Sequence, residues 1–425
     1  MSVSEAISFV INNFQSGAWP TIVDILITVA PIFLAVILFR IMWDLWVQYI
    51  RAKNYMAAER IVLELRLPKD TYKSPLAMET FLNALHNTSD GSKYAQFWQG
   101  NVRPYFSLEL VSIEGAVKFF LWMEKIRKTN LISALYSQFP EIEVSEREDY
   151  AKSVHFDPKV TRIWGGEFVF TKKDHEPYPI KTYVDYGLDK DPKEEYKIDP
   201  LTPLLEWLGS VPPNQQAWVQ IIIRAHKKAR KKGHIFKETD VWEDDIKKLI
   251  NETMIRNEKT KITGAPTKEG EFPRPPTLSE GEKKSLEALE RRLTKHPFDV
   301  GIRAVYISPK DEFDTPYVLG GIIGSFKHFS SANLNGFKPN GKVWHGRLDY
   351  PWQDFRNYRR NLYSKQALMA YKRRSYFYPP FQRKPIVMNS EELATIYHFP
   401  GSVAATPSLE RVPSKKAQAP ANLPM

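Results

Sequence analysis

The chain has 425 residues, carries 60 Lys and Arg against 49 Asp and Glu, and contains no cysteine. The absence of thiols excludes disulfide scaffolds, cysteine nucleophiles and cysteine-ligated zinc or iron–sulfur sites. Apolar residues make up 43% of the sequence and aromatic residues 13%, which is enough for packed cores. A chain of this length typically forms two or three domains.

An apolar stretch lies near the N-terminus. Residues 22–39 contain a single charged residue, Asp24, and approach the roughly 20 apolar residues that span the hydrocarbon of a bilayer. Residues of the kind that form interfacial aromatic belts follow it: Trp43, Trp46 and Tyr49. We therefore expect a transmembrane helix over residues 21–50, kinked near Pro31, with a buried core helix as the alternative.

The charges around this stretch predict its orientation. No Lys or Arg precedes the stretch, whereas Arg40, Arg51 and Lys53 follow it. Because positive residues favour the cytoplasmic side, we expect a single-pass protein of the inner (plasma) membrane, with residues 1–20 outside and the C-terminal bulk in the cytoplasm. The missing basic region also argues against a cleaved signal peptide. Residues 1–20 are expected to be either a short interfacial helix or disordered.

Residues 55–150 show the element order β-α-β-β-α-β. This order is the split β-α-β pattern of ferredoxin-like modules, in which two helices cover one face of a four-stranded antiparallel sheet. The first helix has Ser74 as its predicted N-cap and Pro75 in its first turn. The predicted strands are 61–66, 106–113, 116–123 and 141–145, and the predicted helices are 74–87 and 129–139.

Residues 160–340 predict a second α+β module that contains a charged insertion, residues 226–296. Within the insertion, Ser279 and Glu282 have the spacing of a capping box that opens a helix. The predicted strands are 166–171, 180–186, 217–225 and 299–308, and the predicted helices are 201–208 and 316–331. The fold class is therefore α+β, with an N-terminal transmembrane helix, a ferredoxin-like module and a second α+β module.

Residues 341–388 form a basic aromatic segment. Between Lys342 and Lys384 there are eleven Lys and Arg but only two acidic residues, with aromatic residues interleaved. Cations that neutralise phosphates and rings that stack on bases suit single-stranded nucleic acid, but a protein interface or a lipid-facing surface is an equally open alternative. Together with a compact cluster in the insertion, the candidate binding residues are Lys227, Lys228, Arg230, Lys231, Lys232, Arg356, Arg359, Arg360, Lys372, Arg373 and Arg374.

Signatures of catalysis and of cofactor or metal binding do not appear in the sequence. There is no G-x4-G-K-[ST] loop, and the nine histidines show no H-E-x-x-H spacing. The nearest glycine-rich run contains Gly320, Gly321 and Gly324 within a helical pattern, so we expect these glycines to allow close helix packing. We therefore expect no enzyme activity, no cofactor and no metal, with an unrecognised hydrolase as the alternative.

Residues 389–403 begin with the sequence NSEELATIYHFP and precede a Pro-rich tail, residues 404–425. This element resembles the E-E-L-A-x-x-[FYW]-H-x-P region before the motor domain of membrane-anchored type IV secretion, or conjugative DNA transfer, ATPases of the HerA/TraG kind. No Walker lysine is present to carry over. The resemblance implies a non-motor scaffold subunit of a translocation apparatus, with a separately encoded P-loop ATPase, DNA and a ring of identical subunits as its expected partners.

The same element has an apolar face of its own, beside a tail with several prolines. We expect this face either to dock on a neighbouring motor or to pack on its own domain. The candidate docking residues are Glu391, Glu392, Leu393, Tyr397, His398 and Pro400. The alternative function is a membrane-tethered nucleic-acid-binding protein that acts without a motor.

Overall fold

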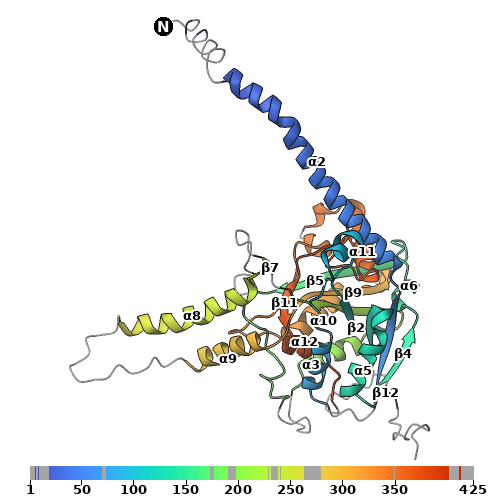
Figure 1. The fold of residues 1–425 in the computed structure, drawn as a ribbon. Coiled ribbons are helices and arrows are strands. Elements are labelled where there is room, and N and C mark those ends of the chain that lie inside the picture. The colour runs from blue at the N-terminus through green and yellow to red at the C-terminus, as the bar shows by residue number, and fades with distance from the viewer. Residues whose placement is uncertain are drawn as a thin grey trace, which may run out of the picture. The chain divides into compact units, whose positions relative to one another are not determined.

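The structure, a computed structural model, describes residues 5, 8, 19–68, 73–172, 177–189, 198–227, 229–230, 238–239, 241–262, 279–348, 350–401 and 411–412. The chain divides into two compact units, drawn in Figure 1. Unit 1 contains residues 1–58 and 90–102, and unit 2 contains residues 59–89 and 103–425. The predicted interfacial helix of residues 1–20 and the tail 404–425 lie almost entirely outside the described residues.

Unit 1 is built on one long helix, α2 (Trp19–Ala57), which continues through Pro31. Its segment Val29–Ala57 is long and apolar enough to cross a membrane. The large apolar side chains between Ile32 and Phe39 are more than half exposed, as expected for a surface that faces lipid. A short helix, α4 (Lys93–Trp98), completes the described secondary structure of this unit.

Unit 2 is organised around one sheet, which is antiparallel except where β12 joins β1. Its strand order is β10-β5-β9-β6-β2-β3-β1-β12, with β4 also paired to β1 and β11 to β9. A separate two-stranded ribbon joins β7 to β8. The strands are β1 (Arg60–Pro68), β2 (Tyr105–Ile113), β3 (Ala116–Glu124), β4 (Glu143–Arg147), β5 (Thr161–Phe170), β6 (Gln216–Ala225), β7 (Ala229–Arg230), β8 (Glu238–Thr239), β9 (Pro297–Pro309), β10 (Phe337–Pro339), β11 (Ile386–Asn389) and β12 (Arg411–Val412).

The helices predicted at 74–87, 129–139, 201–208 and 316–331 are present as α3, α5, α7 and α10, whereas α6, α11 and α12 were not predicted. Ser74 caps α3, because its hydroxyl accepts a hydrogen bond from the Leu76 amide at 3.3 Å, and Pro75 occupies the first turn. The helices of unit 2 are α3 (Pro75–Ala84), α5 (Lys128–Gln138), α6 (Tyr150–Ser153), α7 (Thr202–Gly209), α8 (Val241–Ile262), α9 (Glu280–Thr294), α10 (Thr315–Lys327), α11 (Tyr358–Lys372) and α12 (Ser390–Ile396), with short 3-10 turns at Lys125–Arg127, Lys310–Glu312, Trp344–Arg347, Pro351–Gln353 and Phe355–Asn357.

The two halves of the sheet repeat one plan. In the first half the order is β4-β1-β3-β2, and every neighbouring pair is antiparallel. In the second half the order is β10-β5-β9-β6, again antiparallel throughout. The halves meet where β2 pairs with β6, from Tyr105 opposite Arg224 to Ile113 opposite Gln216. The strands predicted for two successive modules therefore belong to one continuous sheet.

Two parts of the second half differ from the sequence prediction. Residues 180–186 form no strand, since the chain turns repeatedly between Tyr183 and Asp189. The fourth strand is instead β10, which pairs with β5 and which the sequence analysis missed because it is only three residues long. The helix that opens at Ser279 is present as α9, and its capping box with Glu282 is formed.

The two faces of the sheet have different covers, on opposite sides of the strands in Figure 1. On β2 and β6, side chains alternate between an apolar face, with Leu108 and Ile221 in the main core, and a polar face, with Glu109 and Gln220. Helices α3, α5, α7, α10 and α12 contribute side chains to the apolar core. Helices α6 and α11 cover the polar face. Segments 341–388 and 389–403 are thus both integral to unit 2.

The glycine run in α10 generates a prediction. A Cβ at Gly321 would lie 1.8 Å from the Trp207 Nε1, whereas a Cβ at Gly320 would meet nothing within 4 Å. We predict that Gly321→Ala lowers the free energy of unfolding by about 1–3 kcal/mol through overpacking. Gly320→Ala is the matched control, expected to raise it by up to about 1 kcal/mol because alanine favours helix. Chemical denaturation measures both, and equal effects would contradict the packing role.

Candidate functional site

The basic aromatic segment is held to the sheet by a buried arginine. Arg374 is 1% exposed, and its Nε and Nη2 donate to the two carboxylate oxygens of Glu109 at 3.0 and 3.1 Å. Arg374 Nη2 also donates to Asp149 at 2.9 Å. Glu109 further accepts hydrogen bonds from the Tyr150 hydroxyl at 2.7 Å and from the Gln220 amide at 2.8 Å. Arg374 therefore joins the end of α11 to the polar face of β2.

A second buried pair fixes the same segment further along the sheet. The Arg303 guanidinium on β9 lies 3.2 Å from the Glu167 carboxylate on β5, and neither side chain is more than 1% exposed. Arg303 also donates to the carbonyls of Ala370 and Ser375, at 2.7 and 3.0 Å. The sequence analysis did not predict the Arg374–Glu109 pair or the Arg303–Glu167 pair. A signal was available, because Glu167 and Arg303 are isolated charges within largely apolar strands.

The burial of Arg374 corrects one of the predicted binding residues. Its guanidinium is occupied by two carboxylates beneath α11, so it is not available to a nucleic acid. Lys372 is half-buried and donates to the Val154 carbonyl, and burial lowers its pKa. Replacing the neighbouring cations together with Arg374 would therefore disturb the fold as well as any binding.

The remaining candidate cations divide by position. Arg356, Arg359 and Arg373 are exposed, and Arg360 is half-buried with its Nη1 donating to the Asn357 side chain at 3.2 Å. In the insertion, Lys227 is exposed, and Arg230 lies in β7. Lys228, Lys231 and Lys232 lie outside the described residues.

An exposed basic aromatic surface precedes and opens α11. We call it the α11 patch, and it consists of Tyr350, Trp352, Phe355, Arg356, Tyr358 and Arg359. The Trp352 side chain is 78% exposed, Phe355 is 77% exposed and Tyr358 is 72% exposed. The rings of Tyr350 and Trp352 stack with their centroids 4.6 Å apart, and the Arg356 guanidinium lies 5.2 Å from the Phe355 ring.

Local backbone geometry forms this patch. Arg356 and Asn357 adopt left-handed conformations, with φ of 52° and 60°, immediately before α11. Asp354 then caps the helix, since its carboxylate accepts from the amides of Arg359 at 2.7 Å and Arg360 at 3.1 Å. This turn leaves the rings exposed in solvent, where large apolar side chains have no packing role. The arrangement has the chemistry to stack on planar groups and to neutralise anions.

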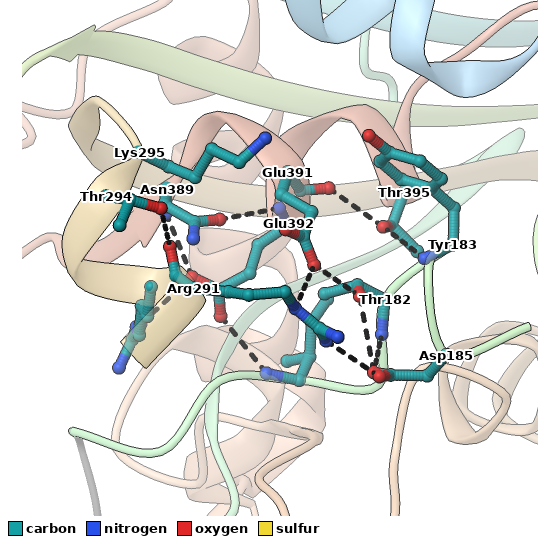
Figure 2. Close-up of polar contacts among 12 residues, drawn as sticks. Thr182, Tyr183, Asp185, Arg291, Thr294, Lys295, Asn389, Glu391, Glu392 and Thr395 are labelled. Carbon is teal, nitrogen blue, oxygen red and sulfur yellow. Dashed lines mark hydrogen bonds and ion pairs between the residues drawn. The ribbon is translucent and has the colours of Figure 1, made fainter. Parts of the chain in front are cut away.

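The E-E-L-A element forms a second polar centre, on the other face of the sheet (Figure 2). Asn389 and Glu392 make a capping box at the start of α12, with bonds of 2.8 and 2.9 Å between each side chain and the other residue's amide. The Arg292 guanidinium of α9 lies 3.1 Å from the Glu392 carboxylate, and both side chains are fully buried. Arg292 also donates to the Val387 carbonyl at 2.7 Å.

Glu391, the neighbouring carboxylate, is less well paired. One of its oxygens accepts from the Thr182 hydroxyl at 2.6 Å and lies 3.6 Å from Arg291, while its other oxygen is buried without a hydrogen bond. Figure 2 shows Arg291 reaching from α9 between Glu391 and Asp185. Burial raises the pKa of Glu391, and the hydrogen bond from Thr182 and the charge of Arg291 only partly oppose it.

The predicted docking face is buried in this fold, where it packs on its own domain, the second of the two expectations for it. All six candidate residues are buried: Glu391, Glu392, Leu393, Tyr397, His398 and Pro400. The Tyr397 ring packs 5.7 Å from the Phe119 ring, and its hydroxyl donates to the Phe120 carbonyl at 3.3 Å. The physical reason is that the apolar face of α12 completes the core over α3 and β3.

His398 forms a buried pair with Asp199, with 3.1 Å between Nε2 and the carboxylate. Burial by itself lowers the pKa of His398, but the Asp199 charge and hydrogen bond outweigh it and raise the pKa. The same contact lowers the pKa of Asp199 against the effect of burial. This pair ties the end of the element to the start of α7.

Comparison with known families places the chain in one of them. Residues 52–411 match the family described as a domain of unknown function, DUF8128, and the chain belongs to this family. No curated protein matches the chain. Among the described residues, no group of three or more His, Asp or Glu side chains is placed to hold a metal ion.

The unequal pairing of the two carboxylates in α12 predicts opposite effects of one substitution. Glu391→Gln should raise the free energy of unfolding at pH 8, because burial disfavours the ionised form. The gain should vanish as the pH falls below the ordinary carboxyl pKa of 4.5. Glu392→Gln is the matched variant and should cost about 3–5 kcal/mol, because it removes the carboxylate that pairs with the fully buried Arg292 guanidinium. Similar losses in both variants would contradict this difference.

The raised pKa of His398 predicts how stability depends on pH. The contribution of the pair is fully present below the ordinary histidine pKa of 6.5 and is lost as the pH rises through the folded-state value. Between these values the free energy of unfolding should fall by up to about 1.4 kcal/mol per pH unit. His398→Asn should remove this slope, measured by denaturation from pH 6 to 9. An unchanged slope in the variant would exclude the pair as its source.

Proposed function

We propose that the chain is a membrane-anchored, non-catalytic scaffold subunit of a type IV secretion-like, conjugative translocation apparatus. The observation that carries this proposal is the direct succession of a helix able to cross a membrane and a body of α and β elements, with only Ala58 and Glu59 between α2 and β1. The anchor is in the inner (plasma) membrane, with the N-terminus outside and the body in the cytoplasm, because the basic residues follow the apolar stretch.

The fold of the body is, in this proposal, a pair of ferredoxin-like modules. Each half of the sheet supports it, since the strand orders β4-β1-β3-β2 and β10-β5-β9-β6 are those of a split β-α-β unit. In such a unit one antiparallel strand, here β3 or β9, lies between two strands that run parallel to each other. Modules of this kind host many unrelated functions, so the fold by itself specifies neither a partner nor a chemistry. The partner that supplies energy is a P-loop ATPase of the HerA/TraG kind, and the working form is a ring.

Co-purification tests the scaffold role. The full chain, tagged and extracted in mild detergent, should enrich a P-loop ATPase over an unrelated single-span bait that is expressed, extracted and analysed in parallel. Quantitative mass spectrometry of both eluates is the measurement. Full recovery of the tagged chain with no P-loop ATPase above the control bait would overturn the proposal.

A second candidate function, a membrane-tethered protein that binds single-stranded nucleic acid without a motor, is favoured by the α11 patch. Its rings are exposed and its two arginines lie among them, as sequence-tolerant binding to single strands requires. In this function the buried part of the basic segment provides the support, and the patch provides the contacts.

Binding to a fluorescent oligothymidine tests this candidate. The affinity of the full chain in detergent should fall steeply as salt increases, because bound phosphates release their counterions. Replacing Trp352, Phe355 and Tyr358 by Ala should weaken binding by about 1–3 kcal/mol per stacked ring. Tyr136→Ala is the control, since Tyr136 is also an exposed ring, at 40%. Salt-insensitive binding, or equal affinities for the triple variant and the control, would exclude the patch.

A further inference from the structure

The segment between α3 and β2 contains a second element of unit 1. Residues 90–102 pack on the C-terminal half of α2, although in sequence they lie between α3 and β2, which both belong to unit 2. The ring of Trp43 lies 5.8 Å from that of Phe97 and 6.3 Å from that of Trp98. The ring of Trp46 lies 5.7 Å from that of Trp98.

Specific contacts hold this segment on α2. The Trp46 indole donates to the Phe97 carbonyl at 3.2 Å, and the Asn54 amide donates to the Gln99 carbonyl at 2.9 Å. Gly100 has a φ of 74°, and a Cβ there would lie 2.4 Å from the Ile50 carbonyl oxygen. The close approach at Gly100 and the two side-chain bonds show that the segment is built against the helix.

The outer surface of this cluster is aromatic and exposed. We call it the collar, and it consists of Trp43, Trp46 and Tyr49 of α2 with Tyr94, Phe97 and Trp98 of α4. Tyr94 is 65% exposed, Tyr49 is 61% exposed and Trp98 is 54% exposed. Rings with an apolar body and a polar edge are the side chains that favour the boundary between hydrocarbon and water.

The length of α2 relates the collar to the thickness of a bilayer. From Trp19 to Arg40 the helix rises about 32 Å, close to the roughly 30 Å of a hydrocarbon core. At about 1.5 Å per residue, Trp43 and Trp46 then lie about 5–9 Å beyond the end of the hydrocarbon. The headgroup layer adds about 5–7 Å on each side, so Trp43 lies within it and Trp46 lies just past its outer edge. Arg40, which pairs with Asp44 at 3.4 Å, marks the same boundary.

We propose that the collar is a binding site for the headgroup layer of the bilayer that α2 spans. Helix α4 supplies Tyr94 and Trp98 as interfacial anchors next to the part of α2 that follows the span, and Lys93 at its start adds a cation for lipid phosphate. The occupant is lipid rather than a protein because the collar continues the exposed apolar surface of Ile32–Phe39 along one helix. This inference rests on the membrane-spanning part of the proposed function.

The absence of cysteine permits a direct test. Single variants Ile37→Cys, Lys93→Cys, Trp98→Cys and Met56→Cys of the full chain are labelled with an environment-sensitive fluorophore and reconstituted into phosphatidylcholine nanodiscs. Quenching by nitroxides at the headgroup and at the middle of the acyl chain is compared. Met56 is the control, because it is 81% exposed and about 15 Å further along α2 than Trp46.

The proposal predicts a distinct pattern at each position. Labels at positions 93 and 98 should be quenched several-fold more by the headgroup nitroxide than by the mid-chain nitroxide, and more than the label at position 56. Lys93→Cys retains every ring, so the test stands even if Trp98→Cys disturbs the segment. Labels at 93 and 98 that respond no more than the label at 56 would overturn the collar. An unquenched label at position 37 would instead overturn the span.

Discussion

The structure of unit 2 depends on the pairing of charges that its sheet carries on one face. Glu109 and Glu167 are buried on adjacent regions of that face, and a buried carboxylate without a counter-charge is strongly destabilising. Arg374 and Arg303 supply the positive charges, and both bind at the same time to the chain around α11. The basic aromatic segment is consequently part of the fold, and only its outer surface is available for binding.

The two polar centres, around α11 and around α12, differ in how much of their surface is exposed for binding. On the polar face of the sheet, Arg374 and Tyr371 are buried at the C-terminal end of α11, whereas the rings and arginines of the α11 patch are exposed at its N-terminal end. On the other face, Glu392 is balanced by Arg292, and the whole of α12 is buried. The E-E-L-A element thus joins α9, α3 and the loop around Thr182 into one core. Its sequence is constrained by packing.

The sequence predicted those elements whose signals are local. Alternating residues identified β1, strands were also predicted at β2, β3, β6 and β9, and capping patterns located α3 and α9, because such signals depend on neighbours along the chain. The long-range contacts had no such signal. Pairing of β2 with β6, and of Arg374 with Glu109, joins residues more than one hundred positions apart. The sequence indicated that the E-E-L-A element has an apolar face. The burial of this face depends on contacts with α3 and β3, which the sequence of the element alone does not reveal.

The same distinction applies to the candidate binding residues. Composition identified the basic aromatic segment, but it could not distinguish Arg373 from Arg374 as candidate binding residues. Arg373 is exposed, whereas Arg374 is buried. The exposed rings of the α11 patch follow from a left-handed turn at Arg356 and Asn357, for which asparagine is a weak signal and arginine is none. Three-dimensional pairing therefore decided which part of a uniform segment supports the fold.

The most direct measurement is the free energy of unfolding of Arg374→Ala compared with Arg373→Ala, by chemical denaturation of the full chain in detergent. If Arg374 neutralises Glu109 and Asp149 beneath α11, its loss should cost about 3–5 kcal/mol, because the buried Glu109 carboxylate then loses its counter-charge. The change at the adjacent, exposed Arg373 should stay within about 0.5 kcal/mol. Equal and small changes at both positions would contradict the account.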